Sequence, residues 1–216
     1  MTKKKILLII VTLLIFTGLT TACSKKVETD YMVLVNKQSK LPEDWEKRIE
    51  LVEVTNGLDE KYQVEKKTAE AYKKLREDLL KDGITIELDS TYRTVEKQQE
   101  IWDEFLEEYG EEYTKTYVAI PGTSEHHTGL AIDIKIIKDG IVIDDNDDMT
   151  KEEEIFSKIH AKLAKYGFIL RYPKGKEDIT GYGAEVWHFR YLDSPKIAKE
   201  IMDNNLTLEE YLENNK

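Results

Sequence analysis

Histidine is scarce in this chain, and three of the four histidines among its 216 residues fall in two short polar tracts. The first tract runs from Ser124 to Asp133 and contains His126, and the second runs from Glu185 to His188. Two imidazoles and a carboxylate suit a catalytic zinc site, which takes three protein ligands and keeps a fourth position for water. We therefore predict that His126, Asp133 and His188 bind one Zn²⁺. Glu185, the remaining carboxylate, would act as the general base.

These residue types suit the hydrolysis of an amide bond. A peptide carbonyl is a poor electrophile and water is a poor nucleophile, but zinc polarises the carbonyl and lowers the pKa of its bound water to about 7. A carboxylate beside the water can take its proton and pass it to the leaving amine. The spacing alone leaves two other interpretations open, namely a hydrogen-bonded polar network and a structural metal site without catalysis.

The positions of these residues place demands on the local backbone. Thr128–Gly129 can turn His126 back towards Asp133, because glycine permits a tight turn. Glu185 and His188 lie three residues apart, so a regular strand would point them to opposite faces of a sheet. We therefore expect either a bulge at this point or a Glu185 that lies in the loop before the strand.

The hydrophobic pattern predicts the elements that must position the site. Helical spacing indicates helices over 64–81, 94–109 and 150–167, with two more after Pro195 and Thr207. Alternating or apolar runs indicate strands over 84–90, 130–135, 141–143, 168–171 and 186–192, with shorter extended segments over 31–35 and 50–54. Residues 111–122, 144–148 and 172–183 are expected to be loops. The predicted fold class is α+β, a small, mostly antiparallel sheet with helices packed on one side and the zinc site on the sheet.

The N-terminal residues are typical of an export signal. Lysines at positions 3–5 precede an apolar run over 6–16, and small residues lead to Cys23, the single cysteine. The run is short for a transmembrane helix, and an uncleaved N-terminal anchor is the alternative interpretation. Cys23 follows a small residue as in a bacterial lipoprotein signal, although Thr20 stands where leucine is usual. We expect a signal peptide over 1–22, a lipid on Cys23, a tether over 23–30 and one domain with C-terminal helices over 31–216 that carries the predicted zinc site.

The charge of the chain limits its partners. The formal net charge is −11, and removal of residues 1–22 would make it more negative by three because that segment holds three lysines and no acid. This balance argues against a nucleic acid or an anionic lipid surface as a partner. A single cysteine also excludes an internal disulfide bond, so packing must stabilise the fold.

Three motifs occur in a fixed order along the chain. Ser90-Thr91-Tyr92-Arg93 is followed by Gln98, the tract Ser124 to Asp133 reads Ser-x-His-x-x-Gly-x-Ala-x-Asp, and the last reads Glu-x-Trp-His. Together they resemble the VanY-type D-alanyl-D-alanine carboxypeptidases, a zinc peptidase group that also includes D-Ala-D-Ala dipeptidases and phage endolysins. The resemblance covers roughly residues 31–193 and departs from the family pattern at Thr91, where glycine is common.

The resemblance implies the same roles for the three metal ligands and for Glu185. It implies that Arg93 binds the substrate or stabilises the developing oxyanion, a role that suits its fixed fork of donors. It further implies that Ser124 and Gln98 contact a substrate peptide. His127 has no role in the family pattern and is interpreted as a residue that supports the site or lies exposed, and His160 as a partly buried structural residue.

The function implied is removal of the terminal D-Ala from peptidoglycan stem peptides, by a D,D- or an L,D-carboxypeptidase. The expected location is outside the cytoplasmic membrane of a Gram-positive bacterium, with the membrane reached through the N-terminal lipid and no obligate protein partner. Two alternatives are a peptidoglycan endopeptidase of the endolysin type and a non-catalytic zinc-binding or cell-wall-binding lipoprotein. The lipoprotein-like signal argues against the first, and Glu185 with Arg93 argues against the second.

Overall fold

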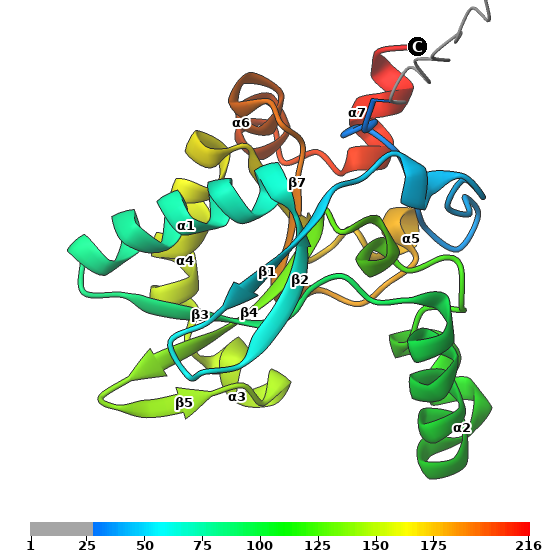
Figure 1. Ribbon diagram of the computed structural model, residues 1–216, viewed down its shortest axis with the longest axis horizontal. Coiled ribbons are helices and arrows are strands. Elements are labelled where there is room, and N and C mark those ends of the chain that lie inside the picture. Colours follow the sequence, from blue (N-terminus) through cyan, green and yellow to red (C-terminus); the bar gives the residue numbers. More distant parts are fainter. Residues whose placement is uncertain (1–27) are drawn as a thin grey trace, which may run out of the picture.

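The computed structural model describes residues 28–216, which fold around a five-stranded antiparallel sheet (Figure 1). The strand order is β3 (Thr85–Ser90), β4 (Ala131–Lys138), β7 (Glu185–Tyr191) and β6 (Phe168–Tyr172), and β5 (Ile141–Ile143) pairs with the far end of β4. A separate hairpin joins β1 (Leu51–Thr55) to β2 (Lys61–Glu65). Within the described residues no helix is long and apolar enough to cross a membrane. The predicted signal peptide and Cys23 lie outside the described residues.

Two helices cover one face of the sheet. The chief core cluster joins α1 (Lys66–Lys81) and α4 (Glu153–Leu163) to the apolar residues that alternate along β4, namely Ile132, Ile134 and Ile136. Full burial of each such side chain stabilises the fold by about 1.5–3 kcal/mol. Since successive side chains of a strand point to opposite faces, Asp133 must face away from these helices. The apolar alternation therefore fixes which face of the sheet carries the polar site.

The C-terminal helices form a second apolar cluster against β6. Helix α6 (Pro195–Asp203) and helix α7 (Leu208–Asn214) pack there, and Thr207 and Glu210 cap α7 reciprocally, as predicted. The remaining short elements are η1 (Trp45–Lys47), η2 (Glu125–Thr128), α3 (Asn146–Lys151), η3 (Ala164–Tyr166) and α5 (Glu177–Thr180).

Several boundaries differ from those predicted. The acidic stretch 144–148 is not a loop throughout, because the Asp145 side chain accepts from the Asp148 amide and starts α3. Residues 31–35 form no strand. Residues 61–65 form a strand, whereas the predicted helix began at residue 64 and no strand was predicted before it. The stretch 111–122 was predicted as a loop and is helical as far as Tyr117.

Helix α2 (Val95–Tyr117) consists of two helical segments joined at Gly110, whose φ of 81° and ψ of 173° are not helical. The chain reverses direction there. Gln98 Nε2 donates to the carbonyl of Ala119 at 2.8 Å, whereas a straight helix would separate these residues by about 30 Å. Figure 1 shows this helical hairpin projecting from the body of the molecule. We call residues 95–119 the α2 hairpin.

Candidate active site

His126 lies in the short η2 turn that precedes β4. The Ser124 hydroxyl accepts from the His126 amide at 3.3 Å and begins the turn. Gly129 ends it with a φ of 69°, a conformation that glycine adopts without strain. The predicted turn at Thr128–Gly129 is confirmed, and it brings the His126 ring back over Asp133 of β4, with Nε2 and Oδ2 3.1 Å apart.

His188 and Glu185 reach the same site because β7 is bulged. Leu170 pairs with Phe189 but Tyr172 pairs with Glu185, so β7 advances four residues where β6 advances two. Of the two arrangements expected here, the structure has the bulge, which leaves Glu185 Oε2 3.6 Å from His188 Nδ1. On its other side β7 pairs with β4 so that His188 lies directly opposite Asp133.

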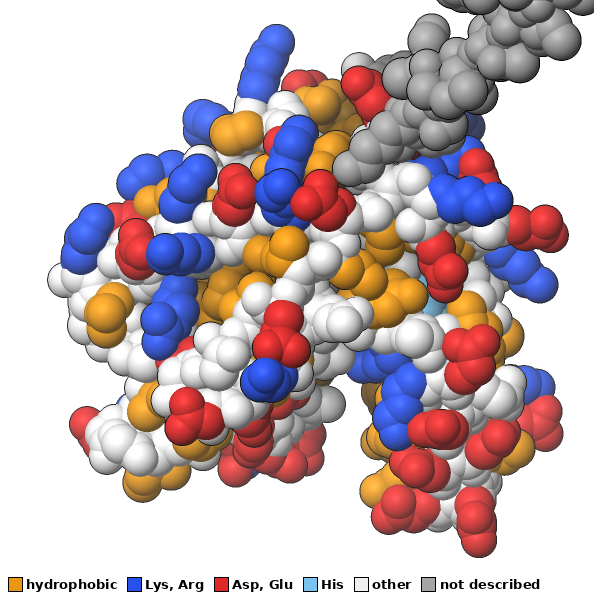
Figure 2. Space-filling view, in the orientation of Figure 1, with side chains coloured by type: hydrophobic (Ala, Val, Ile, Leu, Met, Phe, Trp, Pro, Cys, Tyr) orange, Lys and Arg blue, Asp and Glu red, His pale blue; other side chains and the backbone are white. Residues whose placement is uncertain are grey.

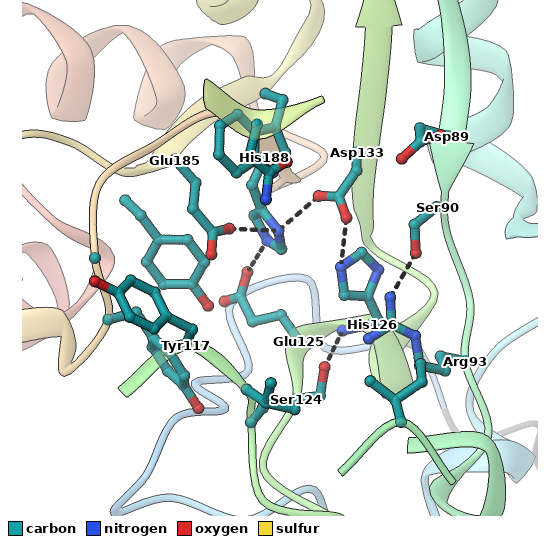
Figure 3. Close-up of a pocket in the computed structure, with 18 of the residues that line it drawn as sticks. Asp89, Ser90, Arg93, Tyr117, Ser124, Glu125, His126, Asp133, Glu185 and His188 are labelled. Atoms are coloured by element: carbon teal, nitrogen blue, oxygen red, sulfur yellow. Dashed lines mark hydrogen bonds and ion pairs between the residues drawn. The ribbon is translucent and has the colours of Figure 1, made fainter. Parts of the chain in front are cut away.

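The three predicted metal ligands converge (Figure 3). One ligand atom from each of His126, Asp133 and His188 lies within 4.8 Å of the other two. The two imidazole rings stand almost perpendicular, with centroids 5.0 Å apart. Asp133 Oδ1 is buried 2.9 Å from His188 Nδ1, yet it accepts no hydrogen bond from any residue that the structure describes. Two imidazoles and a carboxylate that converge this closely fit a divalent cation, and this donor set fits zinc.

To bind a metal, each ring needs a lone pair on the nitrogen that faces the site. A hydrogen bond on the far side of each ring selects that tautomer. His126 Nδ1 donates to the Thr91 carbonyl at 2.7 Å, so Nε2 keeps its lone pair for a metal. His188 Nε2 lies 3.4 Å from Glu125 Oε2, so Nδ1 faces the site. Figure 3 shows the His188 ring between Glu125 and Asp133, and the His126 ring facing Asp133 from the other side.

Glu125 is a functional residue that sequence reasoning missed. It is fully buried and pairs with Arg171 Nε at 2.7 Å and Arg190 Nη1 at 2.8 Å, both also fully buried. Although burial alone would raise the pKa of Glu125, these two guanidinium groups hold it well below its usual range. The available signal was an arginine within each of two strands rich in apolar and aromatic residues, β6 and β7, since a buried charge needs a partner.

The same network reaches both ends of the described chain. Arg171 continues to Glu209 of α7 at 2.6 Å, and Arg190 Nη2 donates to the carbonyls of Tyr31 and Val33 at 3.1 and 2.8 Å. The orientation of the His188 ring thus depends on the docking of α7 and of the segment around residue 31.

The electrostatics of the site favour a cation between the rings and a base beside it. Although burial alone would lower the pKa of His188, Asp133 and the other nearby carboxylates raise it to about 10. Burial raises the pKa of Glu185 to about 7, with Asp133 acting in the same direction and His188 opposing it. A carboxyl group with a pKa near neutrality can both accept and return a proton at neutral pH.

Arg93 is held at the side of the metal site. Its Nη2 donates to Ser90 Oγ at 2.7 Å and its Nη1 to Gln98 Oε1 at 2.9 Å. His127 is buried, and its Nδ1 donates to the Arg93 carbonyl at 2.7 Å. The structure thus gives His127 a supporting contact, and it gives Gln98 a contact with Arg93 that the motif did not reveal.

These groups open into one cavity of about 610 Å³. Aromatic rings line it beside the site, namely Tyr172, Tyr182 and Trp187, and the α2 hairpin forms its outer wall. Trp187 also belongs to the main core cluster. His160 lies outside the cavity, where its Nε2 lies 2.8 Å from the Val186 carbonyl, a structural contact as expected.

Comparison with known proteins gives one consistent family. The family model for VanY, D-alanyl-D-alanine carboxypeptidase, matches residues 61–194. A D-alanyl-D-alanine carboxypeptidase of Enterococcus faecalis is 37% identical over 194 residues, which is 86% of this chain and 66% of the relative. The chain therefore spans about two thirds of that relative's length.

Two solved structures are similar over most of the chain. A vancomycin resistance D,D-pentapeptidase VanY in complex with Zn(II) has a TM-score of 0.71 and 35% identity, covering 84% of this chain and 98% of that one. The LD-carboxypeptidase LdcB has a TM-score of 0.71 and 39% identity, covering 85% of this chain and 86% of that one.

Proposed function

The chain belongs to the VanY family of D-alanyl-D-alanine carboxypeptidases, and we propose that it removes the terminal D-Ala from peptidoglycan stem peptides with one bound Zn²⁺. The observation that carries this proposal is that the His126, Asp133 and His188 triad opens, with Glu185 and Arg93, into a single cavity. A Lewis acid, a base and an oxyanion donor are the three groups that amide hydrolysis needs.

We assign the metal to His126, Asp133 and His188. Zinc bound there would polarise the scissile carbonyl and lower the pKa of a bound water. Glu185, with its pKa near 7, would accept a proton from the attacking water and return it to the leaving amino group. The bulge in β7 brings Glu185 close to His188. The same carboxyl group can therefore lie near enough to take the proton from the water and to pass it to the leaving amine.

Arg93 would bind the carbonyl oxygen as negative charge develops on it. Ser90 and Gln98 take up one guanidinium N–H each, so further donors of the fork can meet the substrate. Gln98 would also act through this contact, in addition to the substrate contact that the family pattern implies for it and for Ser124. Both residues line the cavity.

The proposal is tested with synthetic tetrapeptide and pentapeptide stems. We expect release of the terminal D-Ala, a loss of at least a hundredfold after chelation, and recovery on addition of Zn²⁺. The preferred peptide assigns L,D- or D,D-specificity, and the masses of digested muropeptides separate a carboxypeptidase from an endopeptidase. Glu185→Ala should reduce kcat about a thousandfold while the zinc content stays the same. If that variant releases D-Ala as fast as the wild type, the assigned base is wrong.

We further propose that the protein acts outside the cytoplasmic membrane of a Gram-positive bacterium, anchored by a lipid on Cys23. The support is the order of charged, apolar and small residues before the single cysteine. Expression of the full chain with labelled fatty acid should give a labelled membrane fraction. Cys23→Ala should abolish the label, and equal labelling of both forms would contradict the anchor.

A further inference from the structure

Four aromatic rings gather on the α2 hairpin without being buried. Phe105, Tyr109, Tyr113 and Tyr117 form a continuous chain of ring contacts, with successive centroids 5.3, 4.8 and 4.5 Å apart. Phe105 also stacks on Tyr113 across the turn at Gly110, at 6.5 Å. We call these four residues the aromatic cluster. The three tyrosines are 49%, 43% and 57% exposed, so the cluster is not part of a core.

The aromatic cluster is continuous with the active site. Phe105, Tyr113 and Tyr117 line the same cavity as His126, Asp133 and His188. Whatever occupies the inner end of the cavity can therefore extend directly onto these rings. An exposed group of aromatic rings beside a catalytic centre marks a binding surface rather than ordinary surface composition.

The length of a stem peptide matches the distance along the hairpin. Gln98, which contacts Arg93 at the inner end, and Tyr109 lie eleven residues apart on one helical segment, which is about 16 Å. Four or five extended residues span about 13–18 Å. A stem peptide with its C-terminus at Arg93 would therefore place its other end, where the sugar is attached, at the aromatic cluster.

The charge of the α2 hairpin narrows the possible ligand. Between Val95 and Tyr117 the sequence holds eight acidic and two basic residues. Figure 2 shows carboxylates gathered over this projection, beside a hollow in the surface. This field repels anionic wall polymers, anionic lipids and a second copy of this acidic chain. An uncharged sugar chain is not repelled, since its apolar ring faces stack on aromatic rings and its hydroxyls can donate to carboxylates.

We propose that the aromatic cluster binds the glycan chain to which the stem peptide is attached, so that the enzyme recognises polymeric or disaccharide-linked substrate in preference to free peptide. This inference rests on the proposed function for its choice of substrate. The binding itself does not require catalysis, so the two can fail separately.

The first experiment measures binding of the full chain to glycan strands from which the stem peptides have been removed and whose lactyl carboxyl groups have been converted to amides, so that the probe is uncharged. We expect Tyr109→Ala/Tyr113→Ala to bind at least tenfold more weakly than wild type, and Tyr109→Phe/Tyr113→Phe to retain binding because the rings remain. Leu80→Ala is the matched control, since Leu80 is 56% exposed on helix α1, away from the cavity. Undetectable binding by the wild type, or equal binding by the double alanine variant, overturns the inference.

The second experiment compares kcat/KM for a disaccharide-linked stem peptide and for the same free peptide. The ratio should be about tenfold in favour of the linked form and should fall towards one in Tyr109→Ala, which does not line the cavity. If neither peptide is cleaved, the proposed function fails and the binding experiment still decides the inference. If Tyr109→Ala lowers only the melting temperature, or reduces self-association or vesicle binding in place of glycan binding, the cluster has another role and the inference is wrong.

Discussion

The two walls of the cavity hold their side chains in different ways. On the inner wall His126, Asp133 and His188 have side chains no more than 14% exposed, and each ring is fixed by a hydrogen bond on its far side. On the outer wall the tyrosines of the aromatic cluster are at least 43% exposed and mainly contact one another. The inner wall is rigid enough to direct a bond-breaking step, whereas the outer wall offers an open surface.

Mutations on the two walls of the cavity should therefore have different effects. A change on the inner wall disturbs the metal, the base or the oxyanion donor, and several of its contacts also stabilise the fold. A change on the outer wall removes ligand contact with little effect on stability, since exposed groups lose little on truncation. We therefore expect a graded series of effects on catalysis, from the groups that act on the scissile bond, through those that support a zinc ligand, to those that only position another side chain.

After the thousandfold loss expected for Glu185→Ala, the next largest effect is expected at Arg93. Arg93→Lys keeps the positive charge but removes the planar fork that Ser90 and Gln98 hold. We expect kcat to fall about a hundredfold with the zinc content unchanged, as measured by D-Ala release and metal analysis. The control is Arg48→Lys, which alters a partly exposed arginine paired with Asp44, and it should stay within about twofold. Similar rates for the two variants would remove Arg93 from the chemistry.

Glu125 should affect zinc binding and stability together. Glu125→Gln leaves Arg171 and Arg190 without their shared carboxylate, and removing one partner of a buried ionic network costs about 3–5 kcal/mol. It also weakens the support of His188, for which we expect a ten- to hundredfold loss of Zn²⁺ affinity. Thermal unfolding and zinc titration measure the two effects. Glu209→Gln, at the more exposed end of Arg171, should lower stability less, and the opposite order would refute this account of the network.

Zinc binding should be linked to proton release, so that the affinity for Zn²⁺ changes by up to tenfold per pH unit. The carboxylates around His188 raise its pKa to about 10 without metal, so the ring is protonated at pH 7, and a metal ligand must be deprotonated. Zinc binding at pH 7 should therefore release at least one proton, and affinity should rise as pH rises towards 10. Calorimetry in two buffers of different ionisation enthalpy measures the number released. A binding heat that is independent of the buffer would show that His188 is neutral before zinc binds.

The inner wall could be predicted from the sequence because its determinants are local. Gly129 permits the tight turn that ends η2. The alternation of Ile132 and Ile134 around Asp133 fixes the face of the sheet on which that carboxylate lies. The three-residue spacing of Glu185 and His188 contradicts a regular strand, which is why either a bulge or a Glu185 in the preceding loop was expected, and the structure has the bulge. In each case the residues next to it in the sequence determine the local structure.

The rest of the site depends on contacts between residues far apart in sequence. Glu125 meets Arg171 and Arg190 across 46 and 65 positions, and no periodicity reports such pairing. The sequence predicted a single helix over 94–109 that ends before Gly110, because glycine there usually stops a helix. The chain instead reverses and forms a second helical segment, since the Gln98 amide and Ala119 carbonyl close the base of the hairpin.

The smallest expected effect lies at Gln98, where the two walls join. Its buried side chain accepts from Arg93 and donates to Ala119, so it links the oxyanion donor to the base of the α2 hairpin. Gln98→Ala removes both bonds, each contributing about 1 kcal/mol, and we expect kcat/KM to fall about fivefold. Gln99→Ala is the matched control, because that neighbouring side chain is exposed and contacts only Asp103 among the hydrogen-bond partners described. If the loss in Gln98→Ala is the same for free and for glycan-linked peptide, Gln98 acts through Arg93 alone. A greater loss for the linked peptide means that the α2 hairpin has moved. The hydrogen bond from the Gln98 amide to Ala119 then holds the outer wall in place.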